Sequence, residues 1–169
     1  AAAAGIDFSL APDTIAPSVG ITHPIGGSTV AALGFIEGGM TDNLAEGGRV
    51  SLAVQDALLD LWWDGQERRW KAGGPVYTRL GQGPLRESGA WSVDAGTSPG
   101  GYGLTDALTQ GRSYRLYARG MDLVGNETAE PALASFKWSG PTGDVPPPAP
   151  AWISAQANSS TTIIWTWAL

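Results

Sequence analysis

The residues of this chain that could do chemistry are few and scattered. The sole histidine, His23, precedes a proline, and no Gly-x-Ser-x-Gly motif accompanies it, so a Ser-His-Asp arrangement is not indicated. A glycoside hydrolase needs two carboxyl groups that face each other across a cleft. The acidic residues considered for that role fall in or beside expected turns: Asp60, Asp64, Glu67 and Glu87. Nothing in their spacing pairs any two of them, so we expect no enzyme activity and assign no catalytic residue.

The composition removes several classes of cofactor and partner. Phosphate loops, dinucleotide fingerprints and zinc spacings are absent from the sequence, and Cys 0 removes thiolate nucleophiles, disulfides and cysteine metal sites. We therefore expect no cofactor. The net charge of −6 argues against a nucleic-acid partner, because the basic residues cluster only at Arg68, Arg69 and Lys71 beside Trp70, where a solvated turn is expected. No apolar run reaches the ~18 residues of a membrane span, so none is expected in this segment.

One set of oxygen-bearing side chains suggests a calcium site. In a sandwich the entry to the first strand and two loops meet at one end, and five such residues lie in or beside those segments: Asp13, Asp42, Asn43, Asp122 and Asn126. Several oxygen ligands at a domain junction could hold Ca²⁺ and stiffen it. The alternative is that Asp122 and Asn126 satisfy the backbone of their own turn, as Asx residues do. Both interpretations stay open, and no residue is assigned as a metal ligand.

The eight tryptophans suggest a different function. Aromatic rings that lie flat on a sheet bind sugar rings, so a carbohydrate-binding module is the alternative to a structural role. Trp62 and Trp63 point to opposite faces of a strand, and Trp70 with the polar segment 64–67 could extend a sugar platform. The competing interpretation is that Trp63, Trp70 and Trp91 fill the core or cover a sheet edge.

The element that best reveals the architecture is the stretch from Leu108 to Asn126. Leu108, Gly111 and Tyr114 have the spacing of a tyrosine corner, in which a Tyr that opens a strand hydrogen-bonds back to the preceding turn. From Tyr114 the residues alternate between apolar and polar, which predicts a strand with one buried face. The strand ends at the turn Asp122–Asn126.

Further strands follow from alternation and turn signals. They are expected at Val19–His23, Leu33–Met40, Arg49–Gln55, Leu58–Trp63, Val76–Leu80, Trp91–Val93, Tyr114–Met121 and Ala132–Trp138. Val50, Leu52 and Val54 are expected to face inward. Residues 56–60 would also allow a helical turn. The predicted fold is all-β, an immunoglobulin-like antiparallel β-sandwich.

Proline-rich segments divide the chain. Two similar phrases, Phe8–Pro17 and Phe136–Asp144, each run from a short strand through Pro, Asp and Thr, and the second continues into the proline run 146–150. We expect residues 1–15 to carry the last strand of a preceding module, 16–140 to be a complete module, and 141–150 to be a linker. Residues 151–169 would be the first two strands of the next module. The opening alanines lack the features of a signal peptide, which leaves either a cytosolic protein or an internal piece of a longer one. The two similar phrases near the termini favour the internal piece.

Taken in order, these phrases resemble the bacterial immunoglobulin-like repeats of large secreted and cell-surface proteins. The matching residues are Ala16–Val19, Pro24, Gly27–Ser28, Ile36–Gly38, Asp42, Trp63–Gly65, Trp70, Trp91, Tyr114–Asp122 and Gly125–Asn126. The tail from Pro147 resembles the first two strands of a fibronectin type III module, with Trp165 at the position of that family's core tryptophan. Two features depart from the pattern: the loop Leu44–Gly48 is rich in Gly and Glu, and the region around Leu58–Leu61 is unusually apolar.

The resemblance implies an extracellular or cell-surface module for spacing, display or adhesion. Such a repeat would belong to a bacterial adhesin, filament or secreted multidomain protein. Its partners would be neighbouring modules or subunits of the same protein, which could pair with the strands of 1–15 and 151–169 by strand addition. A polysaccharide is the partner implied by the alternative function.

Overall fold

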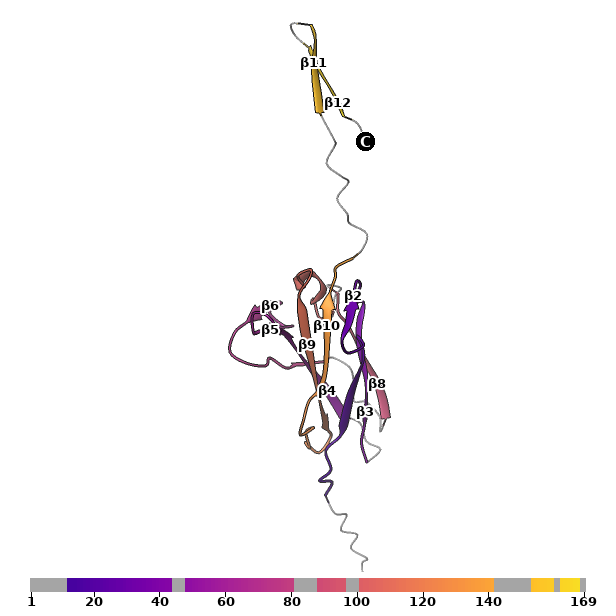
Figure 1. Ribbon diagram of the computed structural model, residues 1–169. Coiled ribbons are helices and arrows are strands. Elements are labelled where there is room, and N and C mark those ends of the chain that lie inside the picture. The colour runs from indigo at the N-terminus through magenta and orange to yellow at the C-terminus, as the bar shows by residue number, and fades with distance from the viewer. Residues whose placement is uncertain are drawn as a thin grey trace, which may run out of the picture.

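The computed structural model describes residues 12–43, 48–80, 88–96, 101–141, 153–159 and 162–167. Within them the regular structure is strands plus one short 3₁₀ turn at Thr105–Ala107 (Figure 1). The predicted all-β class is therefore confirmed. No helix among the described residues is long and apolar enough to cross a membrane.

The smaller of the two sheets of the sandwich has three antiparallel strands. Strand β3 (Phe35–Thr41) lies between β1 (Ser18–His23) and β8 (Ser88–Asp94). β1 and β3 coincide closely with predicted strands, because each alternates apolar and small or polar residues, whereas β8 begins three residues before the predicted Trp91–Val93. A register shift separates Ile21 from His23 where β1 pairs with β3.

The larger sheet carries the stretch around the tyrosine corner. Its strands lie in the order β2 (Ser28–Val30), β10 (Ala132–Trp138), β9 (Ser113–Asp122), β4 (Gly48–Asp56), β5 (Leu61–Asp64) and β6 (Arg69–Lys71). The two-residue strand β7 (Thr78–Arg79) also pairs with β4. All pairs are antiparallel except β2 with β10, which are parallel. The sheet is therefore mixed, where a purely antiparallel one was expected.

The two sheets enclose one apolar core, formed by the inward side chains of each. The smaller sheet contributes Ile36, Met40 and Trp91, and the larger sheet contributes Leu52, Leu116 and Phe136, all at most 2% exposed. Burying a side chain of this size stabilises the fold by roughly 1.5–3 kcal/mol. Val50, Leu52 and Val54 are buried as predicted from the period of β4. The core thus follows directly from the period-2 pattern.

The predicted tyrosine corner is confirmed. Tyr114 is fully buried, and its hydroxyl oxygen accepts a hydrogen bond from the backbone N–H of Thr109 at 2.8 Å. Its ring stacks on Trp70 with centroids 5.7 Å apart and packs against Phe136 at 5.6 Å. The corner therefore fixes the start of β9 to both the preceding turn and the core.

Several predicted boundaries were wrong where local turns override the apolar pattern. The strand expected at Leu58–Trp63 begins only at Leu61, because Asp56 caps a turn: its carboxylate accepts the N–H groups of Leu58 and Leu59, and Asp60 N–H bonds to Asp56 O. The helical turn that the sequence allowed here is what forms. The strand expected at Val76–Leu80 shrinks to Thr78–Arg79. The short strands β2 and β6 were not predicted, and β6 lies within the expected solvated turn.

The tail forms a two-stranded antiparallel hairpin, as predicted. Strands β11 (Ile153–Ser159) and β12 (Thr162–Trp167) pair with each other from Ile153 opposite Trp167 to Ser159 opposite Thr162. The strand predicted for a preceding module falls on residues 1–11, outside the described residues. Residues 12–15 are irregular.

Candidate functional site

Three carboxylates from distant parts of the sequence meet at the end of the sandwich where the chain enters. Oxygen atoms of Asp13, Asp42 and Asp122 lie within 4.8 Å of one another. Asp13 belongs to the segment before β1, Asp42 directly follows β3, and Asp122 ends β9. The geometry expected for one end of a sandwich is therefore present. We call these residues the entry cluster.

Asp122 organises this end of the molecule. Its Oδ1 accepts the backbone N–H groups of Gly125 at 2.6 Å and Asn126 at 2.7 Å, and its Oδ2 accepts the Asn126 side-chain amide at 2.7 Å. That amide also donates to the backbone carbonyl of Asp13 at 3.1 Å. Burial alone would raise the pKa of Asp122, but the donors from Asn126 and Gly125 outweigh it and hold the pKa below its ordinary value. The turn is thus capped and tied to the entry segment.

The other two carboxylates have fewer partners. Oδ1 of Asp13 accepts the N–H of Ile15 at 3.0 Å and the side-chain amide of Asn43 at 3.2 Å, and Oδ1 of Asp42 accepts the N–H of Asn43 at 2.9 Å. All five residues of the calcium hypothesis are therefore brought together.

The entry cluster has the donor chemistry that Ca²⁺ requires, namely carboxylate and carbonyl oxygens. In this structure, however, Asp122 accepts the backbone N–H groups of its own turn at Gly125 and Asn126, which is the alternative Asx role. The side-chain amides of Asn43 and Asn126 also donate to the carboxylates of Asp13 and Asp122. Calorimetry with calcium separates the two interpretations. Heat together with a raised melting temperature would indicate a cation site, and neither would indicate a turn cap.

Four of the five tryptophans with described side chains pack inward. Trp63 and Trp91 are 2% and 1% exposed, and Trp138 is also buried. Trp70 packs against the core, edge-on to Trp63 at 5.3 Å. The indole N–H groups of Trp63 and Trp70 donate to the carbonyls of Tyr102 and Ala107.

A sugar platform of Trp62, Trp63 and Trp70 is therefore not formed. The predicted opposition of Trp62 and Trp63 is confirmed, but Trp62 on the outer face is only 9% exposed and packs on Tyr117, with centroids 5.3 Å apart. The side chains of Trp152, Trp165 and Trp167 lie outside the described structure.

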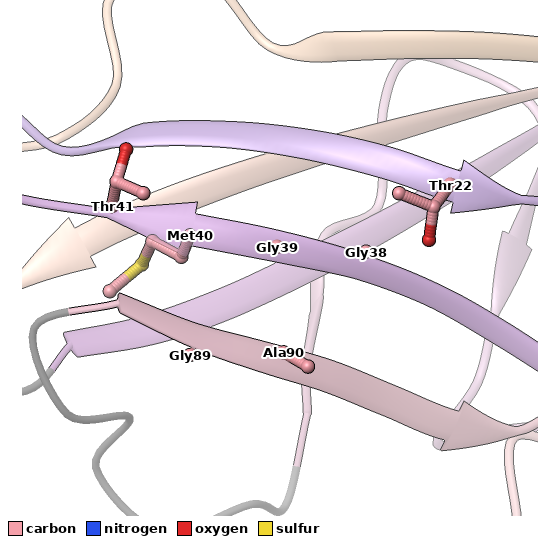
Figure 2. Close-up of a pocket in the computed structure, with 7 residues that line it drawn as sticks. All are labelled: Thr22, Gly38, Gly39, Met40, Thr41, Gly89 and Ala90. Carbon is pink, nitrogen blue, oxygen red and sulfur yellow. The ribbon is translucent and has the colours of Figure 1, made fainter.

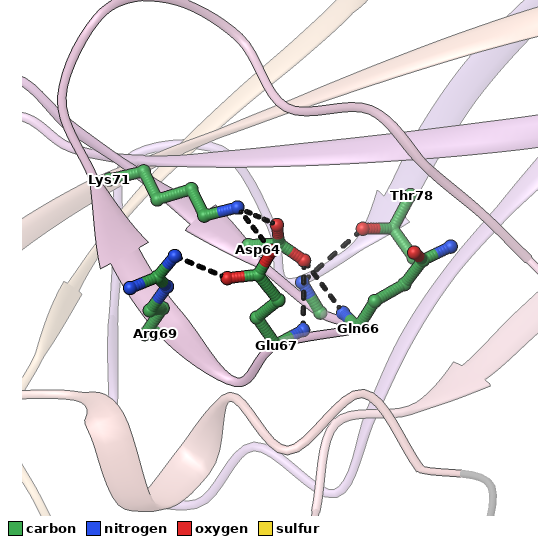
Figure 3. Close-up of polar contacts among 7 residues, drawn as sticks. Asp64, Gln66, Glu67, Arg69, Lys71 and Thr78 are labelled. Carbon is green, nitrogen blue, oxygen red and sulfur yellow. Dashed lines mark hydrogen bonds and ion pairs between the residues drawn. The ribbon is translucent and has the colours of Figure 1, made fainter.

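A second polar cluster closes the β5–β6 hairpin (Figure 3). Oδ1 of Asp64 accepts the N–H groups of Gln66 and Glu67, and its Oδ2 pairs with Nζ of Lys71 at 2.6 Å. Lys71 also pairs with Glu67 at 2.8 Å, and Arg69 pairs with Glu67 at 2.5 Å. The Lys71 ammonium, followed by the Glu67 N–H, lowers the pKa of Asp64 to about 2. The cluster is a structural lock, because every charge in it has a partner.

The remaining candidates for acid–base chemistry are dispersed. His23 ends β1 and lies opposite Glu37 of β3. Asp60 lies in the turn after β4, where its Oδ1 accepts a hydrogen bond from the Gln55 side-chain amide. Glu87 lies outside the described residues. Asp56 is buried and paired with Arg112 at 2.7 Å. Its burial favours a higher pKa, but the Arg112 hydrogen bond and the Leu58 and Leu59 amides hold that pKa below its ordinary value.

A shallow hollow lies on the outer face of the smaller sheet (Figure 2). It follows the backbone of β3 and β8 at Gly38, Gly39, Gly89 and Ala90, with Thr22 and Thr41 at its rim. The hollow exists because these residues have little or no side chain. Its lining residues offer two hydroxyl groups, from Thr22 and Thr41, and none of them has a titratable side chain.

Comparison with protein-family models and with curated proteins gives no match for this chain. The sequence named the charged residues of the β5–β6 lock but did not predict that they pair, and it missed the charged outer face of the larger sheet. The Asp-x₆-Lys spacing of the lock could have been found only by recognising β5 and β6 as a hairpin.

Proposed function

We propose that the chain contains an immunoglobulin-like sandwich that serves as a non-catalytic structural and adhesive module of a large bacterial surface, filament or secreted protein. The strand order supports the immunoglobulin-like assignment: β1, β3 and β8 face a sheet in which β10, β9 and β4 are consecutive and β2 runs beside β10. The dispersal of its acids and its histidine supports a role without catalysis.

One observation carries the structural role. The chain enters and leaves the sandwich at opposite ends, and its first and last strands in the larger sheet are parallel neighbours. The chain enters the sandwich beside the C-terminal end of β9, where the Asn126 side-chain amide donates to Asp13 O. It leaves beside the N-terminal end of β9, where Gly111 N–H donates to Trp138 O at 2.7 Å (Figure 1). β2 pairs with β10 from Ser28 opposite Phe136 to Val30 opposite Trp138.

This arrangement suits a module under tension. A force that pulls the ends apart acts along β2 and β10 in opposite directions, so it loads their hydrogen bonds together in shear. One hydrogen bond lies at each end of this contact: Gly27 N–H donates to Ser135 O at 2.7 Å, and Ser139 N–H donates to Val30 O at 2.9 Å. Several bonds that must break at once resist load better than bonds that break one after another.

A single-molecule pulling experiment on the full chain tests this role. We expect one cooperative rupture that releases the roughly 100 residues between β2 and β10, a contour gain of about 350 Å at ~3.3–3.6 Å per residue. The variant Ser139→Pro removes the backbone and side-chain hydrogen bonds to Val30 O and should lower the rupture force. A gradual extension without a force peak would contradict the proposal.

The proposed partners are neighbouring modules or subunits of the same protein. The hairpin β11–β12 supports this, because two strands that pair only with each other among the described residues are marginal in water. Removing residues 151–169 should abolish assembly in sedimentation measurements and leave the melting transition of the sandwich unchanged. Assembly that persists in the shortened chain would count against strand addition.

A further inference from the structure

The outer face of the larger sheet concentrates positive charge in a protein of net charge −6. We call this surface the basic sheet face; its cations are Arg49, Arg79, Arg115, Arg119 and Lys137. They make up five of the ten Lys and Arg residues of the chain. On β4, β9 and β10 these positions alternate with buried residues of the core, so their side chains face away from it. All but the half-buried Arg119 are exposed.

The strand register arranges this face in rows. One row crosses the strands from Leu133 to Tyr117 to Ala53 and is apolar. Leu133 is 62% exposed and Tyr117 is half-buried, so the row presents apolar surface to solvent.

Cations flank the apolar row on both sides. On one side Ser135, Arg115 and Gln55 are consecutive across the strands. On the other side Arg119 and Arg79 both lie opposite Ser51, one from each neighbouring strand. Arg115 and Arg119 are four residues apart on one strand, about 13 Å at ~3.3 Å per residue. Arg119 and Arg79 are two strand spacings apart, about 10 Å.

Among the described residues, most of these cations have no acidic partner. Of the five, only Arg119 forms an ion pair with a described residue, Glu127, at a long 3.9 Å. The Arg119 guanidinium also lies 4.8 Å above the ring of Tyr77, and Arg115 makes a long 3.4 Å hydrogen bond to Gln55. An aromatic ring and an amide group therefore orient two of the cations.

We propose that the basic sheet face binds an acidic polysaccharide. The apolar row between the cations suits the C–H face of a sugar ring, which packs on aromatic and aliphatic surface. The flanking cations suit carboxylate or sulfate groups that recur along an extended polymer, because they lie on both sides of the apolar row instead of around one pocket.

The apolar row favours a polysaccharide over a nucleic acid. Faces that bind single-stranded nucleic acids stack bases on exposed aromatic rings, whereas this row presents the aliphatic Leu133 and a half-buried Tyr117 that packs on Trp62. The inference names a ligand for the adhesive part of the proposed function. Binding at the basic sheet face does not depend on the load-bearing role, because all residues of that face belong to one sandwich.

Affinity measurements on the full chain test the inference. Polygalacturonate is the carboxylated probe, dextran sulfate the sulfated probe, and dextran the neutral control. We expect binding to at least one of the charged polymers and none to dextran, with affinity that falls as salt is raised. Arg115→Gln and Arg79→Gln should each weaken binding about three- to fivefold, the effect of one exposed charge pair. Preference between the two charged probes identifies the anionic group.

The matched control is Arg68→Gln, which removes an exposed positive charge from the β5–β6 turn, where the side chain lies beside Gly103. Binding should be unchanged in this variant, and melting temperatures should be unchanged in all three. Three results would overturn the inference: no binding to either charged polymer, an equal loss in Arg68→Gln, or tighter binding to single-stranded DNA. A dimer that dissociates in Arg115→Gln would also overturn it, since the face would then join two copies. Any of these outcomes leaves the pulling result unaffected.

Discussion

Asp122 shows how one side chain can join local and distant structure. It accepts two backbone N–H groups of its own turn and the Asn126 amide, which in turn reaches the entry segment at Asp13. Because Asp122 is only 4% exposed, water cannot replace these bonds when the carboxylate is lost.

Asp122→Ala should therefore lower the free energy of unfolding by about 1–3 kcal/mol, since it strands the N–H groups of Gly125 and Asn126. Denaturant unfolding followed by tryptophan fluorescence measures this. Asp42→Ala is the control: among the described residues its carboxylate accepts a single hydrogen bond, from the N–H of Asn43, and the expected loss is within about 0.5 kcal/mol. Equal losses in the two variants would show that Asp122 is not the organising residue.

The decrease in the free energy of unfolding at acid pH should reflect the ionisation of Asp64. Its folded pKa of about 2 lies below the ordinary value of 3.8, so the ionised form stabilises the fold above pH 4 and that contribution disappears as the pH falls from about 4 to about 2. Lys71→Met removes the main cause of the shift, so an NMR titration should show the pKa of Asp64 rise toward 3.8. Arg69→Met removes only the contact to Glu67 and should leave the pKa of Asp64 near 2. An unchanged value in Lys71→Met would refute the lock.

Among the strands, β3 depends on the absence of a side chain at one position. A Cβ at Gly38 would collide with the backbone carbonyl of Gly20 and with the ring of Trp91, whereas a Cβ at Gly20 would meet nothing within 4 Å. The close approach of β1, β3 and the Trp91 indole therefore requires glycine at one of these positions and permits alanine at the other.

Gly38→Ala should destabilise the protein by roughly 1–3 kcal/mol through overpacking. Gly20→Ala should be near neutral, within about 0.5 kcal/mol. Thermal melts of both variants compare the two sites directly. The packing account fails if Gly20→Ala is the more damaging substitution.

The long strands were predictable because alternation and burial coincide in them. β9 and β10 were located within one residue at each end, and the tyrosine corner followed from three residues. The strands β2 and β6 were missed, because three residues are too short to show a period. Around Leu58 the apolar residues predicted a strand, but the carboxylate of Asp56 caps a turn there.

The candidate sites were predictable to different degrees. The entry cluster followed from the rule that strand ends and loops meet at one end of a sandwich. The basic sheet face did not, because Arg79 and Arg119 come together only through a register in which both lie opposite Ser51. The sequence placed those arginines 40 residues apart with no shared motif.

At the scale of the molecule, three features of the fold bear on the proposals. The β2–β10 contact joins the opposite ends of the sandwich, the entry cluster lies where the chain arrives, and the basic sheet face covers the outside of β4, β9 and β10. The central claim is that the rupture force of the sandwich depends on the direction of pulling and is higher between its ends, because a structural module should resist the pull that its neighbours exert.

Pulling the same protein in two directions tests that claim most directly. The chain has no cysteine, so Gln110→Cys and Pro141→Cys provide unique handles at the exit end. A pull between these two residues peels β10 from β9 and β2 one bond at a time, starting at Trp138 and Ser139. We predict a markedly lower rupture force in this geometry than in a pull between the ends of the chain. Equal forces in the two directions would contradict a load-bearing role.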